Sequence, residues 1–307
     1  MIHKHTLQYS IDIPYRQRNR FLIKVLSPYM KRHQRKNLVD SWFFIPGGDA
    51  RNPNSENILV NMSLPPKASL IKTEKEFTLL FQTHCKKMKG TQFVDLPSVT
   101  RHHLLARYGG KRGIEIFSEF AIYHTQLILK LLTGLKKKSF HISQDILGLM
   151  VLCYFMETLG IETQERSLWL GKWIHAFSDI IDSNGKLLQT LYETATNTLR
   201  KEEKLCEILR LLKQGNFYSV SPKVSFILDR YRTAFSQIGK ALRNNENNFR
   251  PRHPRQFVIF HSYIHTHFLC LGFSNLKELC LESLALCEMR SFQQFVFKEK
   301  RRSGKKS

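Results

Sequence analysis

The sequence predicts an α+β fold, in which a small N-terminal β-sheet packs on a large and mainly α-helical body. Two short runs of aromatic and β-branched residues, Ser41–Ile45 and Ile58–Met62, predict the sheet. From Ile114 onward, apolar residues recur three and four positions apart in segment after segment, which is typical of amphipathic helices. A chain of 307 residues, 42% of them hydrophobic, can bury a substantial core.

The N-terminal part is expected to contain a helix and a hairpin. Arg18–His33 has one apolar face and predicts a helix that Pro28 kinks or ends. Ser41–Ile45 predicts a buried strand that a Pro-Gly-Gly turn ends, and Ile58–Met62 predicts a second strand. A polar loop joins the two strands, which favours a hairpin that ends at Pro65.

The remainder predicts one further short strand and a series of helices. The strand is Phe93–Leu96, and the helices are Glu74–Lys89, Ile114–Leu135, Ser143–Leu159, Glu165–Ile181, Lys186–Leu212, Pro222–Leu242, Gln256–Leu271 and Asn275–Phe297. Short connections between the later helices indicate a bundle-like body. We expect a single domain over residues 1–297, followed by a disordered basic tail over residues 298–307.

The chain is strongly basic, with 48 Lys and Arg against 25 Asp and Glu and a net charge of +23. The positive charge is concentrated in Arg16–Lys36, Lys136–Lys138 and Arg250–Arg255. Such a field attracts nucleic acid, anionic lipid or an acidic peptide, although a solvated basic surface is an equal alternative. No sequence pattern of a nucleic-acid-binding module accompanies the charge, so we expect no direct contact with nucleic acid.

The cysteine pattern and the lack of long apolar runs predict a cytoplasmic protein. The six cysteines include no CxxC pair and are expected to be free thiols in a reducing compartment. No apolar run reaches the roughly 20 residues that span a bilayer. Met1–Thr6 lacks the apolar segment of a secretory signal.

Three motifs, in this order, stand out from the rest of the sequence. The first is Asp40-Ser-Trp-Phe-Phe-Ile45 with the strand Ile58–Met62 after it, and the second is Arg107-Tyr-Gly-Gly110. The third is His261-Ser-Tyr-Ile-His-Thr-His267, followed by Glu278 or Glu282. Together they resemble the C-terminal domain of class I lanthipeptide dehydratases, which also exists as a free-standing thiopeptide-type bacteriocin biosynthesis protein.

This resemblance implies an enzyme that matures a ribosomally made precursor peptide. In full-length family members, a separate domain esterifies Ser or Thr with glutamate from glutamyl-tRNA, and the domain of the present type eliminates that glutamate to leave dehydroalanine or dehydrobutyrine. Free-standing relatives perform the same elimination or join two dehydroalanines into a pyridine ring. The implied partners are the precursor peptide and a separate glutamylating dehydratase subunit. A homodimer is also open, and no cofactor is expected.

The resemblance also indicates site residues. His265 matches the family's histidine, and an imidazole with a pKa of about 6.5 suits removal of a Cα proton at neutral pH. Tyr263 and Arg107 complete the expected catalytic set, as a hydrogen-bond donor and a cation. The expected substrate-binding residues are Trp42, Arg51, Tyr108, Arg112 and His261. The alternatives are a half-buried polar stripe for the two histidines and a structural ion pair for Arg107.

A metal site is not expected from the sequence. His261 and His265 are four residues apart and share one face of a helix. However, no nearby Glu or Cys has a spacing that is recognised in metal-binding motifs.

The sequence departs from the family at several arginines, which fall on Pro46, Val60, Met62 and Leu269-Cys270. An arginine binds a carboxylate through two parallel hydrogen bonds, which these residues cannot replace. The loss weakens the case for glutamate elimination and favours either cyclisation or a non-catalytic relative that binds a precursor peptide or a dehydratase. A basic nucleic-acid-binding protein is a further alternative.

Two geometric expectations follow from the resemblance. An exposed strand edge at Ile58–Met62 would accept a leader peptide by β-addition, and the basic surface would favour an acidic leader. The strand that holds Trp42 and the helix that holds His265 should line one shared pocket.

Overall fold

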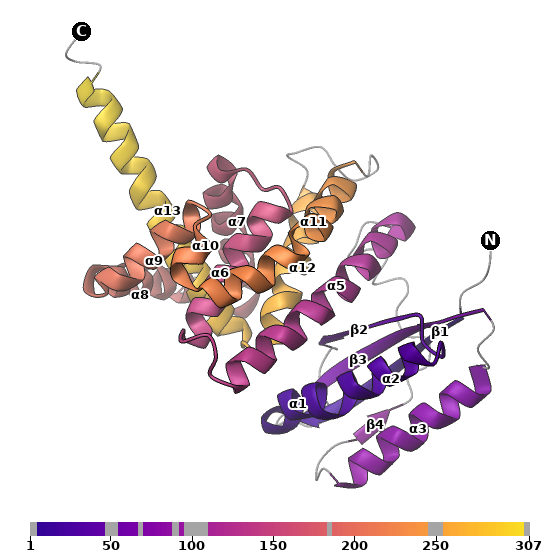
Figure 1. The fold of residues 1–307 in the computed structure, drawn as a ribbon. Helices are drawn as coiled ribbons and strands as arrows, with labels where there is room; N and C mark the ends of the chain where they lie inside the picture. The colour runs from indigo at the N-terminus through magenta and orange to yellow at the C-terminus, as the bar shows by residue number, and fades with distance from the viewer. Residues whose placement is uncertain are drawn as a thin grey trace. The chain divides into compact units, whose positions relative to one another are not determined.

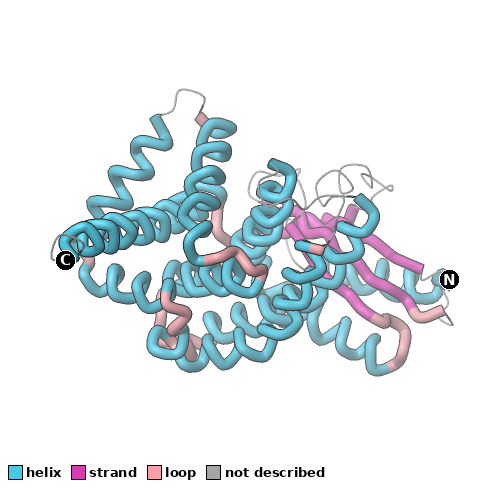
Figure 2. The backbone as a smooth tube through the Cα atoms, turned by 90° about the horizontal axis from the view of Figure 1, so that it is seen from above, coloured by secondary structure: helices cyan, strands magenta, loops and turns pink. Residues whose placement is uncertain are grey.

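The computed structural model describes residues 5–46, 55–66, 70–87, 92–94, 110–182, 186–244 and 254–303. The chain divides into two compact units, residues 1–137 and residues 138–307, and each is considered by itself. The first unit contains the β-sheet, and the second is entirely helical in its described residues (Figures 1 and 2). The predicted α+β class is therefore confirmed. The boundary of a single domain at residue 297 stays a prediction.

The sheet of the first unit has four antiparallel strands in the order β2-β3-β1-β4. The strands are β1 His5–Pro14, β2 Ser41–Pro46, β3 Ser55–Leu64 and β4 Gln92–Val94. β1 and β3 pair along their full length, from His5 opposite Leu64 to Pro14 opposite Ser55. The predicted hairpin of β2 and β3 is confirmed, with Trp42 opposite Met62.

The position of β3 corrects one expectation. β3 lies between β1 and β2, so its backbone hydrogen-bonding groups are paired on both sides. The predicted exposed strand edge at Ile58–Met62 is therefore wrong. It failed because β1 was not predicted from the sequence, and β1 occupies that edge. In the described sheet the outer strands are β2 and β4.

The predicted N-terminal helix is observed, with its irregularity just before Pro28. Three segments follow one another without a break: α1 Tyr15–Phe21, the π-helical η1 Leu22–Leu26 and α2 Ser27–Arg35. Proline has no backbone N–H to donate into the preceding turn, and a π-helical turn is one way a helix accommodates such an interruption. The helix is therefore distorted at this point rather than ended.

Two longer helices complete the first unit, α3 Leu70–Lys87 and α5 Gly110–Lys136. Phe77 of α3 is fully buried and stacks on Tyr9 of β1, with ring centroids 5.3 Å apart. α5 is held to β2 by a buried hydrogen bond, in which the Phe44 backbone N–H donates to Thr125 Oγ1 at 3.1 Å. These contacts build the core of the unit around the sheet.

The second unit is a bundle of helices, as predicted. Its helices are α6 Gln144–Thr158, α7 Thr163–Ile181, α8 Lys186–Lys201, α9 Glu203–Lys213, α10 Phe217–Val220, α11 Pro222–Arg243, α12 Pro254–Leu271 and α13 Asn275–Ser303. The helix predicted over Lys186–Leu212 is in fact two, because the chain leaves helical geometry at Glu202. α13 continues to Ser303, so residues 298–303 of the predicted tail are helical, and residues 304–307 lie outside the described residues.

α6 forms the centre of the second unit. Every residue from Leu147 to Met156 is buried, so this helix is covered on all of its faces. Its start is fixed by Ser143, whose hydroxyl accepts a hydrogen bond from the Ile146 N–H at 3.2 Å. Tyr154 donates a hydrogen bond to the Leu228 carbonyl at 2.7 Å and so ties α6 to α11. Helices α9, α11, α12 and α13 pack against this apolar helix.

One contact between α6 and α11 depends on a glycine. A Cβ added at Gly239 would lie 2.8 Å from both Leu159 Cα and the Thr158 carbonyl oxygen, which are backbone atoms. Gly239→Ala should therefore destabilise the protein by about 1–3 kcal/mol through overpacking, although alanine favours a helix by about 1 kcal/mol. Urea unfolding measures the difference. Gln237→Ala, at an exposed position on the same helix, is the control and should leave stability within about 0.5 kcal/mol; equal stability of the two variants would contradict the close contact.

The stability of the fold should depend on pH through one buried histidine. His124 of α5 is fully buried, and burial lowers the pKa of its imidazole to about 3. Between about pH 6.5 and 3 the unfolded chain therefore binds a proton at this position that the folded chain does not, so stability is complete above about pH 6.5 and falls as the pH decreases. His124→Leu should remove up to about 1.4 kcal/mol per pH unit from this slope, measured by urea unfolding at pH 7, 6 and 5.

The control for this experiment is His175→Gln, which removes an exposed imidazole. It should keep the wild-type slope. An unchanged slope in His124→Leu would show that the buried imidazole does not contribute to the acid sensitivity.

Candidate functional site

The two predicted histidines of α12 face two glutamates of α13. His261 and His265 are one helical turn apart, and so are Glu278 and Glu282. A tight turn joins the two helices, in which Gly272 has a φ of 87° that favours glycine. The turn places α13 beside α12, so the two pairs meet. These four residues are called the His–Glu cluster below.

The contacts within the His–Glu cluster are short. His265 Nδ1 lies 2.7 Å from Glu278 Oε2, and His261 Nε2 lies 3.2 Å from Glu282 Oε1 and 3.5 Å from Glu278 Oε1. The side chains of Glu278 and Glu282 are 0% exposed and that of His261 is 4% exposed, whereas that of His265 is 15% exposed. His265 is therefore the member of the cluster that reaches the surface.

Aromatic side chains of α7 cover the cluster. The Trp173 ring stacks on His261, and Phe177 meets His265 edge-on with ring centroids 5.7 Å apart. A small apolar cavity of about 10 Å³ borders His261 and Glu282. The walls are apolar, so they exclude water from the carboxylates and strengthen the electrostatic interactions between the four side chains.

Burial changes the ionisation of both glutamates. It raises the pKa of Glu282 well above its usual range, and the neighbouring Glu278 carboxylate raises it further. Burial also raises the pKa of Glu278, but its hydrogen bond and charge interaction with His265 oppose the increase. Two carboxylates this close cannot both be charged without a cation. The pKa of Glu282 is raised more strongly, because the hydrogen bond with His265 favours the charged form of Glu278.

The pairing of His265 with Glu278 suits proton transfer. A carboxylate only accepts hydrogen bonds, so Glu278 selects the tautomer of His265 that is protonated on Nδ1. The lone pair is then on Nε2, which makes no hydrogen bond to another residue in the described part of the chain. A histidine held in this way by a buried carboxylate can act as a general base.

Tyr263, the other predicted site residue on α12, is not part of this cluster, and the described residues of the first unit are considered by themselves. Tyr263 is fully buried and lies about 200° around α12 from both histidines, on the opposite face. Arg112 of α5 is exposed and donates a hydrogen bond to Glu115 at 2.9 Å. Trp42 is 7% exposed and lies against Phe44.

Three predicted residues, Arg51, Arg107 and Tyr108, lie outside the described residues. Trp42 belongs to the first unit and His265 to the second, and the two units are described separately. A pocket shared by Trp42 and His265 therefore stays a prediction.

The sequence predicts no metal site, and nothing in the structure tests that expectation, but Glu278 and Glu282 supply carboxylates that its motif spacings did not include. One ligand atom each from His261, Glu278 and Glu282 lie within 4.8 Å of one another. The two carboxylates belong to α13, the helix after the one that holds His261. Their distance from His261 along the sequence does not match a common metal-binding motif. The available signal was the equal spacing of His-x-x-x-His and Glu-x-x-x-Glu on two consecutive helices joined by Gly272.

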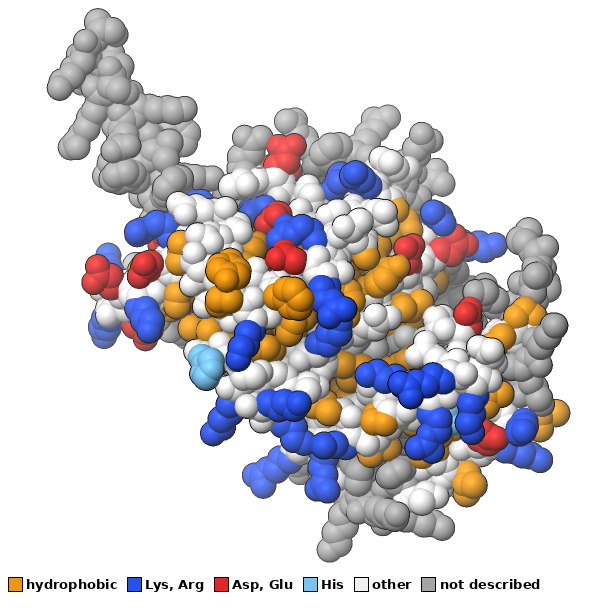
Figure 3. Space-filling model, in the orientation of Figure 1, with side chains coloured by type: hydrophobic (Ala, Val, Ile, Leu, Met, Phe, Trp, Pro, Cys, Tyr) orange, Lys and Arg blue, Asp and Glu red, His pale blue; other side chains and the backbone are white. Residues whose placement is uncertain are grey.

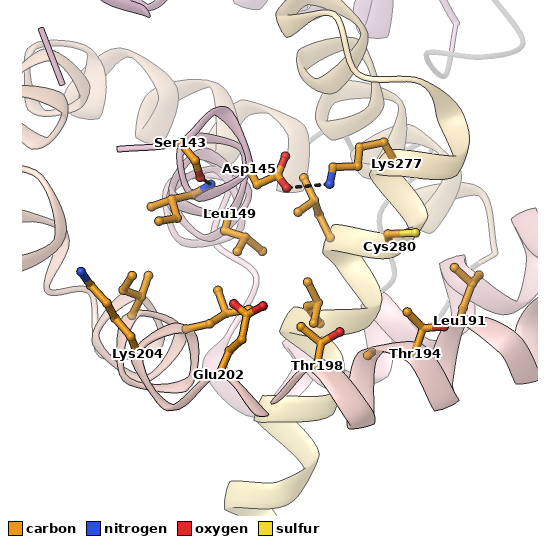
Figure 4. Close-up of a pocket in the computed structure, with 16 residues that line it drawn as sticks. Ser143, Asp145, Leu149, Leu191, Thr194, Thr198, Glu202, Lys204, Lys277 and Cys280 are labelled. Carbon is orange, nitrogen blue, oxygen red and sulfur yellow. Dashed lines mark hydrogen bonds and ion pairs between the residues drawn. The ribbon is translucent and has the colours of Figure 1, made fainter. Parts of the chain in front are cut away.

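A larger pocket of about 510 Å³ lies in the second unit, between α6, α8, α9 and α13 (Figure 4). Leucine side chains such as Leu149 and Leu191 form much of its wall, and Glu202 and Lys204 project from the α8–α9 segment. Lys277 and Asp145 form an ion pair of 2.6 Å at its upper side in this view. This pocket faces the opposite side of α13 from the His–Glu cluster, because Cys280 lines it and lies two residues from each glutamate.

One face of the surface and the described cysteines can be compared with the sequence. On the face drawn in Figure 3, Lys and Arg side chains are scattered among polar and apolar ones. No disulfide links the cysteines whose state the structure describes, which are Cys153, Cys206, Cys270, Cys280 and Cys287. Among the described helices, none is long and apolar enough to cross a membrane.

Residues 7–287 match the family model described as "Lantibiotic biosynthesis dehydratase C-term". The chain therefore belongs to this family, and the resemblance drawn from the three motifs is confirmed. No curated protein matches the chain.

Three solved structures share the fold. The tRNA-dependent lantibiotic dehydratase MibB from Microbispora sp. 107891 is similar with a TM-score of 0.65 and 14% identity, over 94% of this chain and 28% of MibB. TsrL is similar with a TM-score of 0.58 and 13% identity, over 94% of this chain and 95% of TsrL. The pyridine synthase TbtD from thiomuracin biosynthesis is similar with a TM-score of 0.58 and 11% identity, over 92% of this chain and 98% of TbtD.

Proposed function

We propose that this chain modifies a ribosomally made precursor peptide of the lanthipeptide or thiopeptide type, with His265 as the base that removes a Cα proton. The hydrogen bond between His265 and Glu278 carries the proposal, because it leaves the Nε2 lone pair on the more exposed side of the cluster. Membership of the lantibiotic dehydratase C-terminal family supports the peptide substrate.

The reaction that the His265–Glu278 pair supports best is glutamate elimination from glutamylated Ser or Thr. His265 Nε2 takes the Cα proton, the electron pair forms the Cα=Cβ double bond, and the Cβ–O bond breaks to release glutamate as a carboxylate. The products are dehydroalanine or dehydrobutyrine and free glutamate. Glu278 stabilises the imidazolium that forms on His265, as a carboxylate does for the histidine of a catalytic triad.

Negative charge that develops on the substrate needs a cation, which the His–Glu cluster does not supply. We assign this role to Arg107, with Arg112 close to it in the sequence. The proposal also retains the four residues that the resemblance indicates for substrate binding, which are Trp42, Arg51, Tyr108 and His261. Tyr263 has no part in this mechanism, because it lies on the far face of α12 from His265.

A second reaction is favoured by a specific observation in the first unit. Two positions where the family has arginines are Val60 and Met62, which are 0% and 1% exposed and belong to the core. They cannot bind the carboxylate of a glutamyl group. Cyclisation of two dehydroalanines, the reaction type that the name of TbtD indicates, needs no glutamate to be bound and depends more on the orientation of the alkenes.

The proposal implies two partners. One is the precursor peptide, whose leader is expected to be acidic because the chain carries a net charge of +23. The other is a separate dehydratase subunit that attaches glutamate. The match to this chain covers only 28% of the length of MibB. We therefore assign the attachment of glutamate to the partner subunit in this proposal.

His265→Gln tests the proposed base. Removal of the imidazole should slow the conversion of a glutamylated precursor by about 10²–10⁴-fold, the usual contribution of a general base. Mass spectrometry of a precursor co-expressed with the glutamylating enzyme should show that glutamylated species accumulate. His175→Gln, which removes an exposed imidazole of α7, is the matched control and should convert the precursor normally.

Unchanged dehydration by folded His265→Gln would remove His265 from the mechanism. If the wild-type chain leaves glutamylated peptide intact but converts a synthetic dehydroalanine peptide into a pyridine, cyclisation is the reaction. If it binds the precursor and converts neither substrate, the chain is a non-catalytic relative.

A further inference from the structure

Two carboxylates that are fully excluded from water face one histidine nitrogen in the His–Glu cluster. Glu278 and Glu282 are both 0% exposed, and their Oε1 atoms lie 3.5 and 3.2 Å from His261 Nε2. Burial of two carboxylates is costly unless opposite charge accompanies them. Among the described residues, the cluster contains no lysine or arginine, so the compensating charge must come from protons or from a cation.

We propose that His261, Glu278 and Glu282 form a binding site for one divalent transition-metal ion of the zinc type. This site goes beyond the proposed peptide modification and does not depend on it. Imidazole nitrogen and carboxylate oxygen both bind zinc, and this site supplies one of the first and two of the second. A divalent cation balances the two negative charges.

The distances between the donor atoms fit such an ion. Zinc binds nitrogen and carboxylate oxygen at about 2.0–2.2 Å, so the corners of a tetrahedron around it are about 3.3–3.6 Å apart. The two distances from His261 Nε2, 3.2 and 3.5 Å, are close to this range. All three donors lie within 4.8 Å of one another.

Two oxygen atoms of the cluster are available to bind an ion. Glu278 Oε1 and Glu282 Oε2 are buried and have no hydrogen-bond partner among the described residues. A buried polar atom without a partner is uncommon in a folded protein and is explained when it binds an ion. Glu278 Oε1 is also one of the atoms that faces His261 Nε2.

The surroundings favour zinc over magnesium. Mg²⁺ keeps several waters in an octahedral shell, but the cluster is closed by Trp173 and borders a cavity of only about 10 Å³. Zinc needs four ligands, and three protein side chains leave one position for a water or another small ligand.

His265 then has a defined relation to the metal without binding it. Glu278 would bind the ion through Oε1 while its Oε2 accepts the hydrogen bond from His265 Nδ1 at 2.7 Å. Such outer hydrogen bonds orient the ligating carboxylate. The ion would keep Glu278 deprotonated and would therefore hold His265 in a single tautomer.

Metal binding by the purified full-length chain tests this site. The chain is stripped with EDTA, dialysed and titrated with ZnCl₂, MnCl₂ and MgCl₂ in separate calorimetry experiments. We expect one Zn²⁺ per chain, weaker Mn²⁺ binding and no Mg²⁺ binding. Replacement of Zn²⁺ by Co²⁺ should give the visible absorption of a four-coordinate cobalt site. No precursor peptide is needed, so failure of the peptide reaction would not affect this result.

Three variants separate the ligands from their neighbour. Glu282→Gln and His261→Gln each remove one ligand and should weaken Zn²⁺ binding by more than about 100-fold. His265→Gln removes only the outer hydrogen bond and should weaken it by about 10–100-fold. Glu202→Gln, which changes a carboxylate at the larger pocket, is the control and should bind Zn²⁺ like the wild type.

Two results would overturn the proposal. One is wild-type protein that binds no Zn²⁺ and gives no Co²⁺ spectrum, which would show that protons alone balance the cluster. The other is folded Glu282→Gln protein, checked by circular dichroism, that binds Zn²⁺ as tightly as Glu202→Gln protein. The wild-type titration decides the question even if a variant does not fold.

Discussion

Repulsion between two neighbouring carboxylates in a water-free interior is the constraint on which the site depends. Glu278 and Glu282 project from one face of α13 and cannot both be charged without compensation. The two histidines of α12 are their nearest partners, so the electrostatics of the site require these helices to stay side by side. The hydrogen bond between Glu278 and His265 orients the more exposed of the two histidines.

The helices of this protein follow from its sequence more readily than the contacts between them. The three- and four-residue spacing of apolar residues predicted α12 and α13, because this pattern lies entirely within each helix. The meeting of His261 with Glu282 depends on the turn at Gly272 and on the rotation of one helix against the other, which no local pattern encodes. The His–Glu cluster could have been predicted only if the four-residue spacing of the histidines in α12 and that of the glutamates in α13 had been considered together.

β1 was missed for a related reason. Ser10 and Asp12 are polar and suggest a solvated segment, yet both are buried. Asn57 of β3 donates hydrogen bonds to Ser10 Oγ at 2.5 Å and to Asp12 Oδ1 at 2.6 Å, so these groups have partners far away in the sequence. Strand pairing made two polar residues part of the interior, and it also placed β3 at the centre of the sheet.

The burial of α6 on every side has a consequence for how the chain is made. Helices α9, α11, α12 and α13 pack against α6 and follow it in the sequence. A ribosome therefore releases this apolar segment before any of them exists, and the nascent chain exposes a surface that attracts other unfolded chains. Protection by a chaperone during that interval would determine how much of the newly made protein reaches its native state.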